Sequence, residues 1–341
     1  MTKGFRVALI AVASVATLTA ATFAQVQGGP TTPAGARRIL SALADDSMEG
    51  RASGTPGAQR AARYIAGEMR KIGLEPLGDS GFFQRVAVTV GGGAGCRLCV
   101  RESFAALDTV PRDRWRPAVN VLGVIRGSDP VLRNEHVLVD AHYDHLGIGR
   151  PVNGDSIYNG ADDDASGVTA VLEIARQMRN GPRPKRTVVF AAMIGEEVGL
   201  LGTRWYIAHP AIPLDRMAAN LEIEMIGRPD ELAGGPGKAW LTGYERSTMG
   251  DELAANGIPI VPDRRPEQQF FQRSDNIAFA QRGIPAHTLS SFNLHADYHQ
   301  PSDDISKVDF EHVAGVINAG AKAVRLLTDG PKPEWKPGGR P

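Results

Sequence analysis

Acidic residues and histidines gather in five short segments, each at the end of an apolar stretch or in a nearby loop. These segments are 140–145, 160–167, 195–199, 220–228 and 297–303. In the first, His142 and Asp144 alternate along an expected strand end and therefore point to the same side. A metal-binding histidine usually needs a carboxylate or carbonyl to orient its ring, and a His-x-Asp pair supplies both. Taken alone, the pair fits a polar strand end at the surface better than a metal site.

Three consecutive aspartates, Asp162, Asp163 and Asp164, precede an expected helix in the second segment. Acidic residues at a helix start often cap the helix or complement its dipole. Three of them exceed what one cap needs, so one carboxylate could bridge two cations. By spacing alone, each of the three fits that role.

Two adjacent glutamates, Glu196 and Glu197, follow a buried strand expected over 187–194. Carboxylates at the end of a buried strand are costly unless metal or proton chemistry uses them. Neighbouring residues on a strand end point apart, so one can bind a metal while the other acts as a general base. A solvated turn is the alternative interpretation.

The last two segments supply Glu222, Glu224 and His299. The two glutamates share one face of an otherwise apolar strand, and His299 lies in a loop before the last expected helix. All five segments together offer two histidines and at least three carboxylates, without a thiolate. Nitrogen and oxygen donors of this kind indicate zinc, with manganese or cobalt as alternatives.

The elements that must position these side chains follow from alternating apolar runs and helical patterns. Strands are expected over 119–125, 136–141, 187–194, 221–226 and 285–289. Helices are expected over 57–74, 165–178, 199–208, 249–256, 275–282 and 309–328. The alternation predicts an α/β fold with a doubly wound, mostly parallel central sheet flanked by helices. Such sheets bind ligands beyond the carboxyl ends of their strands, which is where the five segments fall.

The first 24 residues have the pattern of a signal peptide. Lys3 and Arg6 precede an apolar stretch, and small residues end it before Gln25. An uncleaved membrane anchor is the alternative, but the many Ala, Ser and Thr residues make the stretch weakly apolar. We therefore expect an exported protein, periplasmic or secreted, with no stable membrane association after cleavage. The proline-rich tail, 331–341, is expected to be disordered.

Charge and cysteine content narrow the possible partners. Lys plus Arg and Asp plus Glu number 38 each, so no net charge favours nucleic acid or an anionic membrane. Cys96 and Cys99 form a Cys-x-x-Cys pair, and no second pair completes a zinc knuckle. Export favours a small local disulfide over a redox site.

In order and context, the five segments resemble the co-catalytic zinc exopeptidase family of the aminopeptidase Y and leucyl aminopeptidase type. Glutamate carboxypeptidase and glutaminyl cyclase are relatives of that family. The likeness runs from about residue 40 to residue 327 and includes the motifs Ser47-Met48-Glu49-Gly50-Arg51, Gly54-Thr55-Pro56-Gly57, Arg273-Ser274-Asp275 and Gly283-Ile284-Pro285. It implies a zinc-exopeptidase (phosphorylase/hydrolase-like) fold in a single peptidase domain over 25–330. The interval 88–117 is too short for the protease-associated domain that some relatives carry.

The resemblance implies that five side chains hold two zinc ions. His142 and Glu224 would complete one metal position, and Glu197 and His299 would complete the other. Asp163 would bridge both ions. The family usually has aspartate where this chain has Glu224, and the longer side chain changes the geometry expected there.

Other residues near the metals receive supporting roles from the same resemblance. Glu196 would be the general base, and Asp144 would orient His142. Glu222 is a weaker candidate ligand than Glu224, because the run after Glu224 matches the run after the family's aspartate. Three nearby histidines are expected to be supporting or structural: His145, His287 and His295.

The activity implied is that of an aminopeptidase, which removes N-terminal residues from peptide substrates. Carboxypeptidase and glutaminyl cyclase activity on the same fold are the alternatives. The cyclase signature Trp-His-Thr differs from Tyr298-His299-Gln300 here. An inactive binding or receptor module is a remote alternative, because such relatives lose ligands and this chain has plausible ligands at all five positions.

Overall fold

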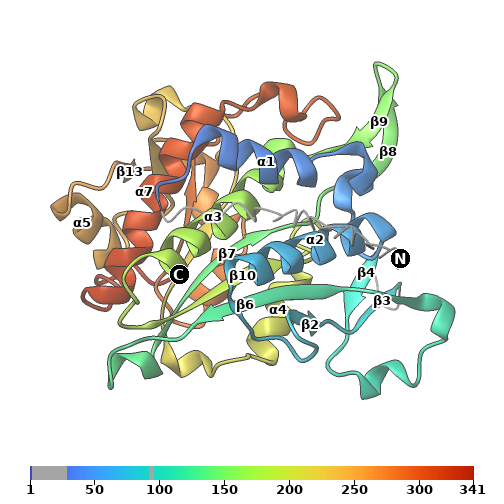
Figure 1. Cartoon of the computed structure of the whole chain (residues 1–341), viewed down its shortest axis with the longest axis horizontal. Coiled ribbons are helices and arrows are strands. Elements are labelled where there is room, and N and C mark those ends of the chain that lie inside the picture. Colours follow the sequence, from blue (N-terminus) through green and yellow to red (C-terminus); the bar gives the residue numbers. More distant parts are fainter. Residues whose placement is uncertain (2–28, 92–95) are drawn as a thin grey trace.

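A nine-stranded mixed sheet forms the centre of the computed structural model of the protein, which describes Met1 and residues 29–91 and 96–341 (Figure 1). The expected signal segment, 1–24, lies outside the described residues apart from Met1. Four neighbouring strands run parallel: β10 (Thr187–Met193), β7 (His136–His142), β11 (Met217–Ile223) and β14 (Ala286–Ser290). The prediction of a mostly parallel central sheet in an α/β fold is confirmed.

Antiparallel strands complete the sheet on both sides of this parallel core. Strand β6 (Val119–Ile125) pairs with β10 and with the short strands β1 (Glu75–Pro76) and β2 (Phe83–Arg85). On the other side, β12 (Ala239–Leu241) pairs antiparallel with β14 and parallel with β13 (Ile260–Pro262).

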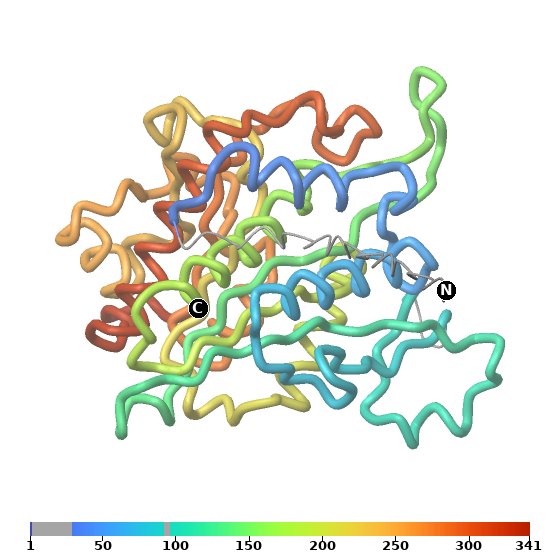
Figure 2. Tube along the Cα trace, viewed as in Figure 1, coloured from blue at the N-terminus to red at the C-terminus, as the bar shows by residue number. Residues whose placement is uncertain are grey.

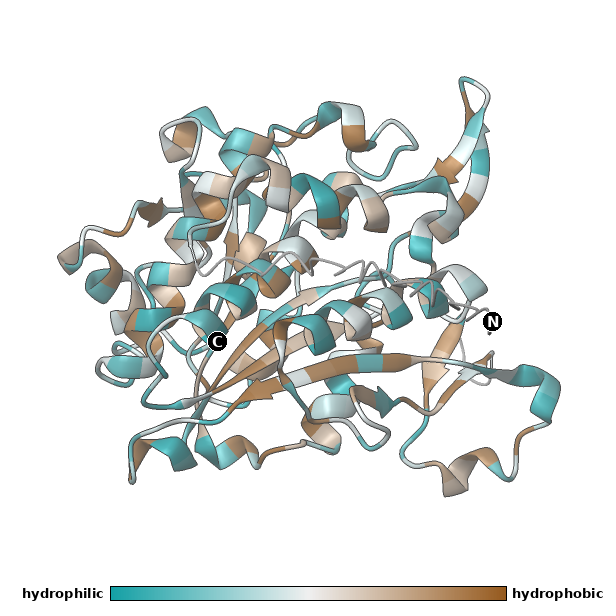
Figure 3. Ribbon diagram, viewed as in Figure 1, coloured by the Kyte–Doolittle hydropathy of each residue, from teal (hydrophilic) through white to brown (hydrophobic). Residues whose placement is uncertain are grey.

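Helices cover both faces of the sheet. One layer contains α1 (Pro33–Leu43), α2 (Pro56–Ile72), α3 (Gly167–Asn180) and α7 (Phe310–Asp329), which contact one another. The other face carries α4 (Leu201–Ala208) and α6 (Asn276–Ala280), while α5 (Thr248–Ala255) lies beside β13 and α7. The central strands are predominantly apolar, whereas the helices carry polar residues on their outer sides (Figure 3). No helix in the described part of the chain has the length and apolarity needed to cross a membrane.

Helix α2 shows how the sequence specifies these elements. Its buried Ala61, Ile65 and Met69 recur at helical spacing and face the core. Thr55 caps the first turn by accepting the Ala58 N–H, and Gly73 ends the helix at a φ of 84°, in the left-handed region that glycine favours.

Strand β11 begins earlier than the sequence suggested, at Met217 rather than 221, and it ends at Ile223. The missed part consists of Met217, Ala218, Ala219 and Asn220, whose alanines lack the β-branched or aromatic character of a typical strand. They fit because every residue of β11 is buried between its neighbouring strands and the two helix layers. Glu224 therefore lies just beyond the strand rather than on it.

Two small sheets lie outside the central one. Strands β3 (Val88–Val90), β4 (Leu98–Val100) and β5 (Trp115–Arg116) form a three-stranded sheet. The predicted disulfide between Cys96 and Cys99 is formed at the start of β4. Strands β8 (Gly147–Val152) and β9 (Asp155–Tyr158) form a hairpin that projects from the body of the molecule (Figure 2).

The C-terminal tail differs from the disorder that its composition suggested. The Trp335 ring lies 6.3 Å from the Phe271 ring and 5.5 Å from the His287 ring, between centroids. The Trp335 indole N–H also donates to the Gly283 carbonyl at 3.0 Å, and Lys336 pairs with Asp251 at 2.7 Å. The Trp335 ring thus adds apolar contact to a segment that backbone hydrogen bonds from Thr248 to Glu334 and from Lys336 to Arg246 also hold on the domain.

We expect Trp335→Ala to lower the free energy of unfolding by about 2–3 kcal/mol, since the ring is only partly buried and a fully buried one costs more. Urea denaturation measures the difference. Lys332→Ala changes an exposed residue of the same tail and serves as the control. Equal stability of both variants and the wild type would mean that the tail contributes nothing to the fold.

Candidate metal centre

The candidate site lies at the carboxyl ends of the parallel strands, as the fold class predicts. Strand β7 ends at His142, which pairs in register with Met193 at the end of β10. Glu196 and Glu197 follow β10, and Glu224 follows β11.

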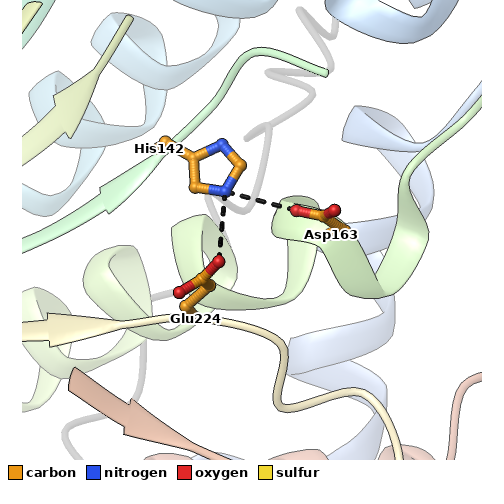
Figure 4. A group of neighbouring side chains, drawn as sticks. All are labelled: His142, Asp163 and Glu224. Carbon is orange, nitrogen blue, oxygen red and sulfur yellow. Dashed lines mark ion pairs between the residues drawn. The ribbon is translucent and has the colours of Figure 1, made fainter. Parts of the chain in front are cut away.

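The first group of side chains consists of His142, Asp163 and Glu224 (Figure 4). The His142 Nε2 atom lies 3.2 Å from Asp163 Oδ1 and 3.8 Å from Glu224 Oε1. Figure 4 shows this ring nitrogen directed towards both carboxylates. Burial alone would lower the pKa of His142, but the two carboxylates outweigh that effect and raise it well above its usual range.

The second group shares Asp163 with the first. His299 Nε2 lies 3.1 Å from Asp163 Oδ2 and 3.3 Å from Glu197 Oε2. His145, expected only as a supporting residue, joins this group: its Nδ1 lies 2.8 Å from Glu197 Oε1 and 3.7 Å from Asp163 Oδ2. Asp163 thus has His142 at one oxygen and His299 at the other.

The other two aspartates of the triplet are engaged elsewhere. Asp162 Oδ1 accepts the Gly227 N–H at 2.6 Å, and its Oδ2 lies 2.8 Å from His295 Nε2. Asp164 Oδ1 accepts the N–H groups of Gly167 and Met225. Of the three aspartates, Asp163 is the one that contacts both His142 and His299.

Asp144 supports the site in two ways. His142 Nδ1 lies 3.1 Å from the Asp144 carbonyl oxygen and 3.8 Å from its carboxylate, so the ring is oriented mainly by the carbonyl. The Asp144 carboxylate instead accepts the N–H groups of Gly195 and Glu196, at 2.7 and 3.2 Å, and the Ser53 hydroxyl at 2.9 Å. It therefore fixes the backbone that carries the paired glutamates.

The two glutamates after β10 differ in their surroundings. Glu197 contacts His145 and His299, whereas Glu196 belongs to neither group of candidate ligands. Burial, together with the charges of Glu224 and Asp275, raises the pKa of Glu196 well above its usual value. A carboxyl group with a raised pKa accepts and returns protons near neutral pH more readily than an ordinary one.

Glu222, the weaker candidate ligand, has a structural role. Its carboxylate accepts the N–H groups of Asp275 and Asn276, at 3.1 and 3.0 Å, where α6 begins. The hydroxyls of Ser274 and Thr288 also donate to it. The carboxylate is fully engaged on the α6 side of the sheet, whereas Glu224 faces His142.

Arg51 has a contribution that its sequence motif does not reveal. Its side chain is fully buried, and its guanidinium donates to four carbonyl oxygens at 2.6–2.9 Å: those of Leu43, Tyr143, Asn159 and Gly160. Tyr143 follows His142, and Gly160 begins the turn that holds Asp163. A single planar donor therefore ties together the two loops that carry these candidate ligands.

Gly50, the residue before Arg51, packs closely against the β8–β9 hairpin. Its φ is 61°, and a Cβ atom there would overlap the backbone of Tyr158 and Gly147 at the base of the β8–β9 hairpin. Only glycine combines that conformation with such close packing.

Chemically, both groups suit zinc. Each combines histidine nitrogen with carboxylate oxygens. The candidate ligand atoms of His142, Asp163 and Glu224 lie within 4.8 Å of one another, as do those of His145, Asp163 and Glu197. The Nε2 atom of His142 is buried and has no hydrogen-bond partner among the described residues. A cation between them would be bound by the lone pairs of this nitrogen and of the Asp163 and Glu224 oxygens, which otherwise point at one another.

Residues 120–323 match the family described as Peptidase family M28. The chain belongs to this family. The matched range contains all seven candidate site residues named from the sequence.

Relatives of this M28 chain include a probable leucine aminopeptidase 2 from Aspergillus oryzae, 27% identical over 256 residues that cover 66% of the chain and 49% of the relative. The chain thus spans about half the length of the curated relatives it matches.

Two solved structures share the fold. An aminopeptidase from Aneurinibacillus sp. strain AM-1 has a TM-score of 0.63 and 17% identity, covering 92% of this chain and 98% of its own. The glutaminyl cyclase of Porphyromonas gingivalis has a TM-score of 0.61 and 14% identity, covering 86% and 97%. At such identities the likeness concerns the fold alone.

We expect Arg51→Lys to weaken both the fold and the metal centre. A lysine keeps the charge but cannot reproduce the planar fork, so buried carbonyls lose donors and the free energy of unfolding falls by about 2–4 kcal/mol. Zinc affinity should fall as well, because the loops of His142 and Asp163 are no longer tied together. Urea denaturation of metal-free protein and zinc titration measure the two effects.

The matched control for this change is Arg60→Lys. Arg60 donates to the Ser47 carbonyl and pairs with Glu49 at 2.8 Å, with 32% of its side chain exposed. This substitution should change neither property measurably. Normal zinc affinity in Arg51→Lys would show that the buried guanidinium does not position the ligands.

Proposed function

We propose that this M28 protein is a zinc aminopeptidase whose site holds two metal ions. The observation that carries the proposal is the position of Asp163, with His142 Nε2 3.2 Å from one carboxylate oxygen and His299 Nε2 3.1 Å from the other. A carboxylate with a separate set of donors on each side is the arrangement that two neighbouring cations require.

The proposed ligands divide into two sets around this bridge. His142 and Glu224 hold the first ion with Asp163, and Glu197 and His299 hold the second. His145 orients Glu197 through their 2.8 Å contact, because ligating carboxylates are themselves usually hydrogen-bonded. Two complete sets favour a two-metal peptidase over a cyclase that works with one zinc ion.

Glu196 acts as the general base in this proposal. It lines the same cavity as Asp163, Glu224 and His299. Bound zinc supplies a Lewis acid that polarises the scissile carbonyl and lowers the pKa of the attacking water. Glu196 accepts the proton of that water and passes it to the leaving amine nitrogen.

The carboxylates beside the site also fit a substrate with a free amino terminus. Glu196 and Glu224 both line the cavity, so an amino group entering beside them meets hydrogen-bond acceptors. That contact would confine cleavage to the terminal residue. N-blocked peptides lack the free amine and should be poor substrates.

Export belongs to the same proposal. The N-terminal pattern Lys3, Arg6 and the following apolar stretch is typical of a signal peptide. The disulfide between Cys96 and Cys99 is consistent with an oxidising compartment.

We expect the purified protein to contain two zinc ions per chain and to lose hydrolysis of aminoacyl p-nitroanilides when a chelator removes them. Adding zinc back should restore the rate. Elemental analysis and initial rates on the same sample test both statements. Full activity in metal-free protein excludes the proposal, and one ion per chain in active protein excludes the two-metal form of it.

The paired glutamates give a sharper test. Glu196→Gln keeps the size of the side chain but removes the base, so turnover should fall by about 10²–10⁴ while both ions stay bound. Glu197→Gln removes a charged ligand and should lower zinc content together with activity. Rates and zinc analysis of each variant distinguish the roles.

Glu245→Gln is the control for these two substitutions, since it makes the same chemical change on a side chain that is 76% exposed. If Glu196→Gln loses zinc and Glu197→Gln keeps it, the two roles are reversed. If neither variant loses activity, the active site lies elsewhere.

A further inference from the structure

The cavity beside the metal centre has one wall whose chemistry the proposed reaction does not use. The space is lined by three carboxylates of the metal centre and its surroundings, those of Asp163, Glu196 and Glu224. Aromatic residues and Arg273 also line it. Arg273 belongs to the Arg273-Ser274-Asp275 motif, for which the metal centre itself provides no role.

The aromatic wall is a packed cluster. The Trp240 and Phe270 rings stack with centroids 5.0 Å apart, and the Phe292 ring meets Phe270 edge-on at 5.9 Å. Tyr298 stacks on His299 at 3.9 Å and also contacts Phe292. Such rings are suited to the apolar part of a substrate side chain and leave little freedom for the wall to rearrange.

Arg273 is held against this wall without an acidic partner. Its Cζ atom lies 5.1 Å from the centre of the Phe270 ring, and its side chain is exposed. Within 29–91 and 96–341, no carboxylate forms an ion pair with Arg273.

Two other arginines near the site contrast with Arg273. Arg228 pairs with Asp297 at 2.6 Å, and Arg265 pairs with Asp230 at 2.7 Å. Both are occupied by carboxylates of the chain itself. The guanidinium in the cavity wall is therefore the one in position to meet a carboxylate that arrives with the substrate.

The lining of the cavity thus combines carboxylates with the guanidinium group of Arg273. A substrate amino group fits beside Glu196 and Glu224, and a guanidinium stacked on an aromatic ring offers a preoriented pair of donors to a carboxylate. Stacking on Phe270 also limits the side-chain freedom that Arg273 loses when it binds an anion.

We propose that Arg273 binds a carboxylate of the substrate residue in this cavity, so that the enzyme prefers peptides carrying an acidic group there. The inference rests on the proposed function, since the cavity is taken as the substrate site. The carboxylate has two sources: the side chain of an N-terminal aspartate or glutamate, or the terminal carboxylate of a dipeptide. Neutral residues also fit the aromatic wall but leave the guanidinium in water.

Isosteric substrate pairs test the contact and separate its sources. The first pair is glutamyl and glutaminyl p-nitroanilide, which differ only in the side-chain carboxylate. The second pair is Leu-Gly and Leu-Gly-amide, which differ only in the terminal carboxylate. We expect kcat/KM to favour the acidic member of one pair by about ten- to hundredfold. Equal values within both pairs overturn the proposal.

Variants of the arginine assign the preference to this side chain. Arg273→Gln should abolish the discrimination, so that kcat/KM becomes equal for the two members of the pair, while Arg273→Lys should retain part of it. Arg112→Gln is the matched control, because Arg112 is exposed and lies over the Trp115 ring at 4.7 Å outside the cavity. Discrimination that survives in Arg273→Gln overturns the assignment.

Calorimetry with free glutamate and glutamine separates this inference from the proposed function. If the side-chain carboxylate is the source, the zinc-loaded protein should bind glutamate about ten- to hundredfold more tightly than glutamine, and Arg273→Gln should bind them equally. If the terminal carboxylate is the source, both amino acids should bind the zinc-loaded protein equally and each should bind Arg273→Gln more weakly. Selective glutamate binding without hydrolysis of any substrate excludes the aminopeptidase and keeps the anion contact. If the protein hydrolyses substrates but discriminates neither within the substrate pairs nor in calorimetry, the aminopeptidase proposal stands and the Arg273–carboxylate contact is excluded.

Discussion

Repulsion between buried carboxylates is the constraint on which the rest of this structure depends. Asp163, Glu197 and Glu224 converge at the strand ends, and Glu196 and Asp164 lie close to them. Burial, reinforced by neighbouring negative charges, raises the pKa of Glu196 and of Asp164. Such a cluster is stable only when cations or proton donors face it. The rings of His142 and His299 contact the cluster, and the charge of the buried Arg51 acts on Asp163 and Asp164. Bound zinc would supply the remaining positive charge.

The parallel sheet brings these carboxylates together. The register places His142 opposite Met193, so β7 and β10 end at the same level, and the Glu196–Glu197 pair follows directly. The N–H groups of Gly195 and Glu196 donate to Asp144, which ties the end of β10 to the end of β7. His299 adopts a φ of 57°, an uncommon conformation for a residue other than glycine. The surrounding structure holds it there, beside Asp163 and Glu197.

Local patterns in the sequence were sufficient to predict the existence of the strands of the parallel core, although β11 begins four residues earlier than expected. The five candidate ligands lie at the ends of these strands or in nearby loops, and the structure brings all five together. What the sequence did not reveal depends on contacts between distant segments. Arg51 binds carbonyls 92 and 108 residues away, and Trp335 donates to Gly283 across 52 residues. Neither contact leaves a periodic pattern, because each depends on one side chain meeting a remote backbone.

Glu224 links the metal centre to the specificity of the cavity. It stands where the family usually has aspartate, and its side chain is 22% exposed, whereas that of Asp163 is 3% exposed. The longer side chain extends towards His142 from just beyond the end of β11 and also lines the cavity. We infer that glutamate in place of aspartate at position 224 changes two things at once: the shape of one metal position and the space next to the substrate amine. Arg273 lines the same cavity, so a change at either residue alters the field in which the substrate is oriented.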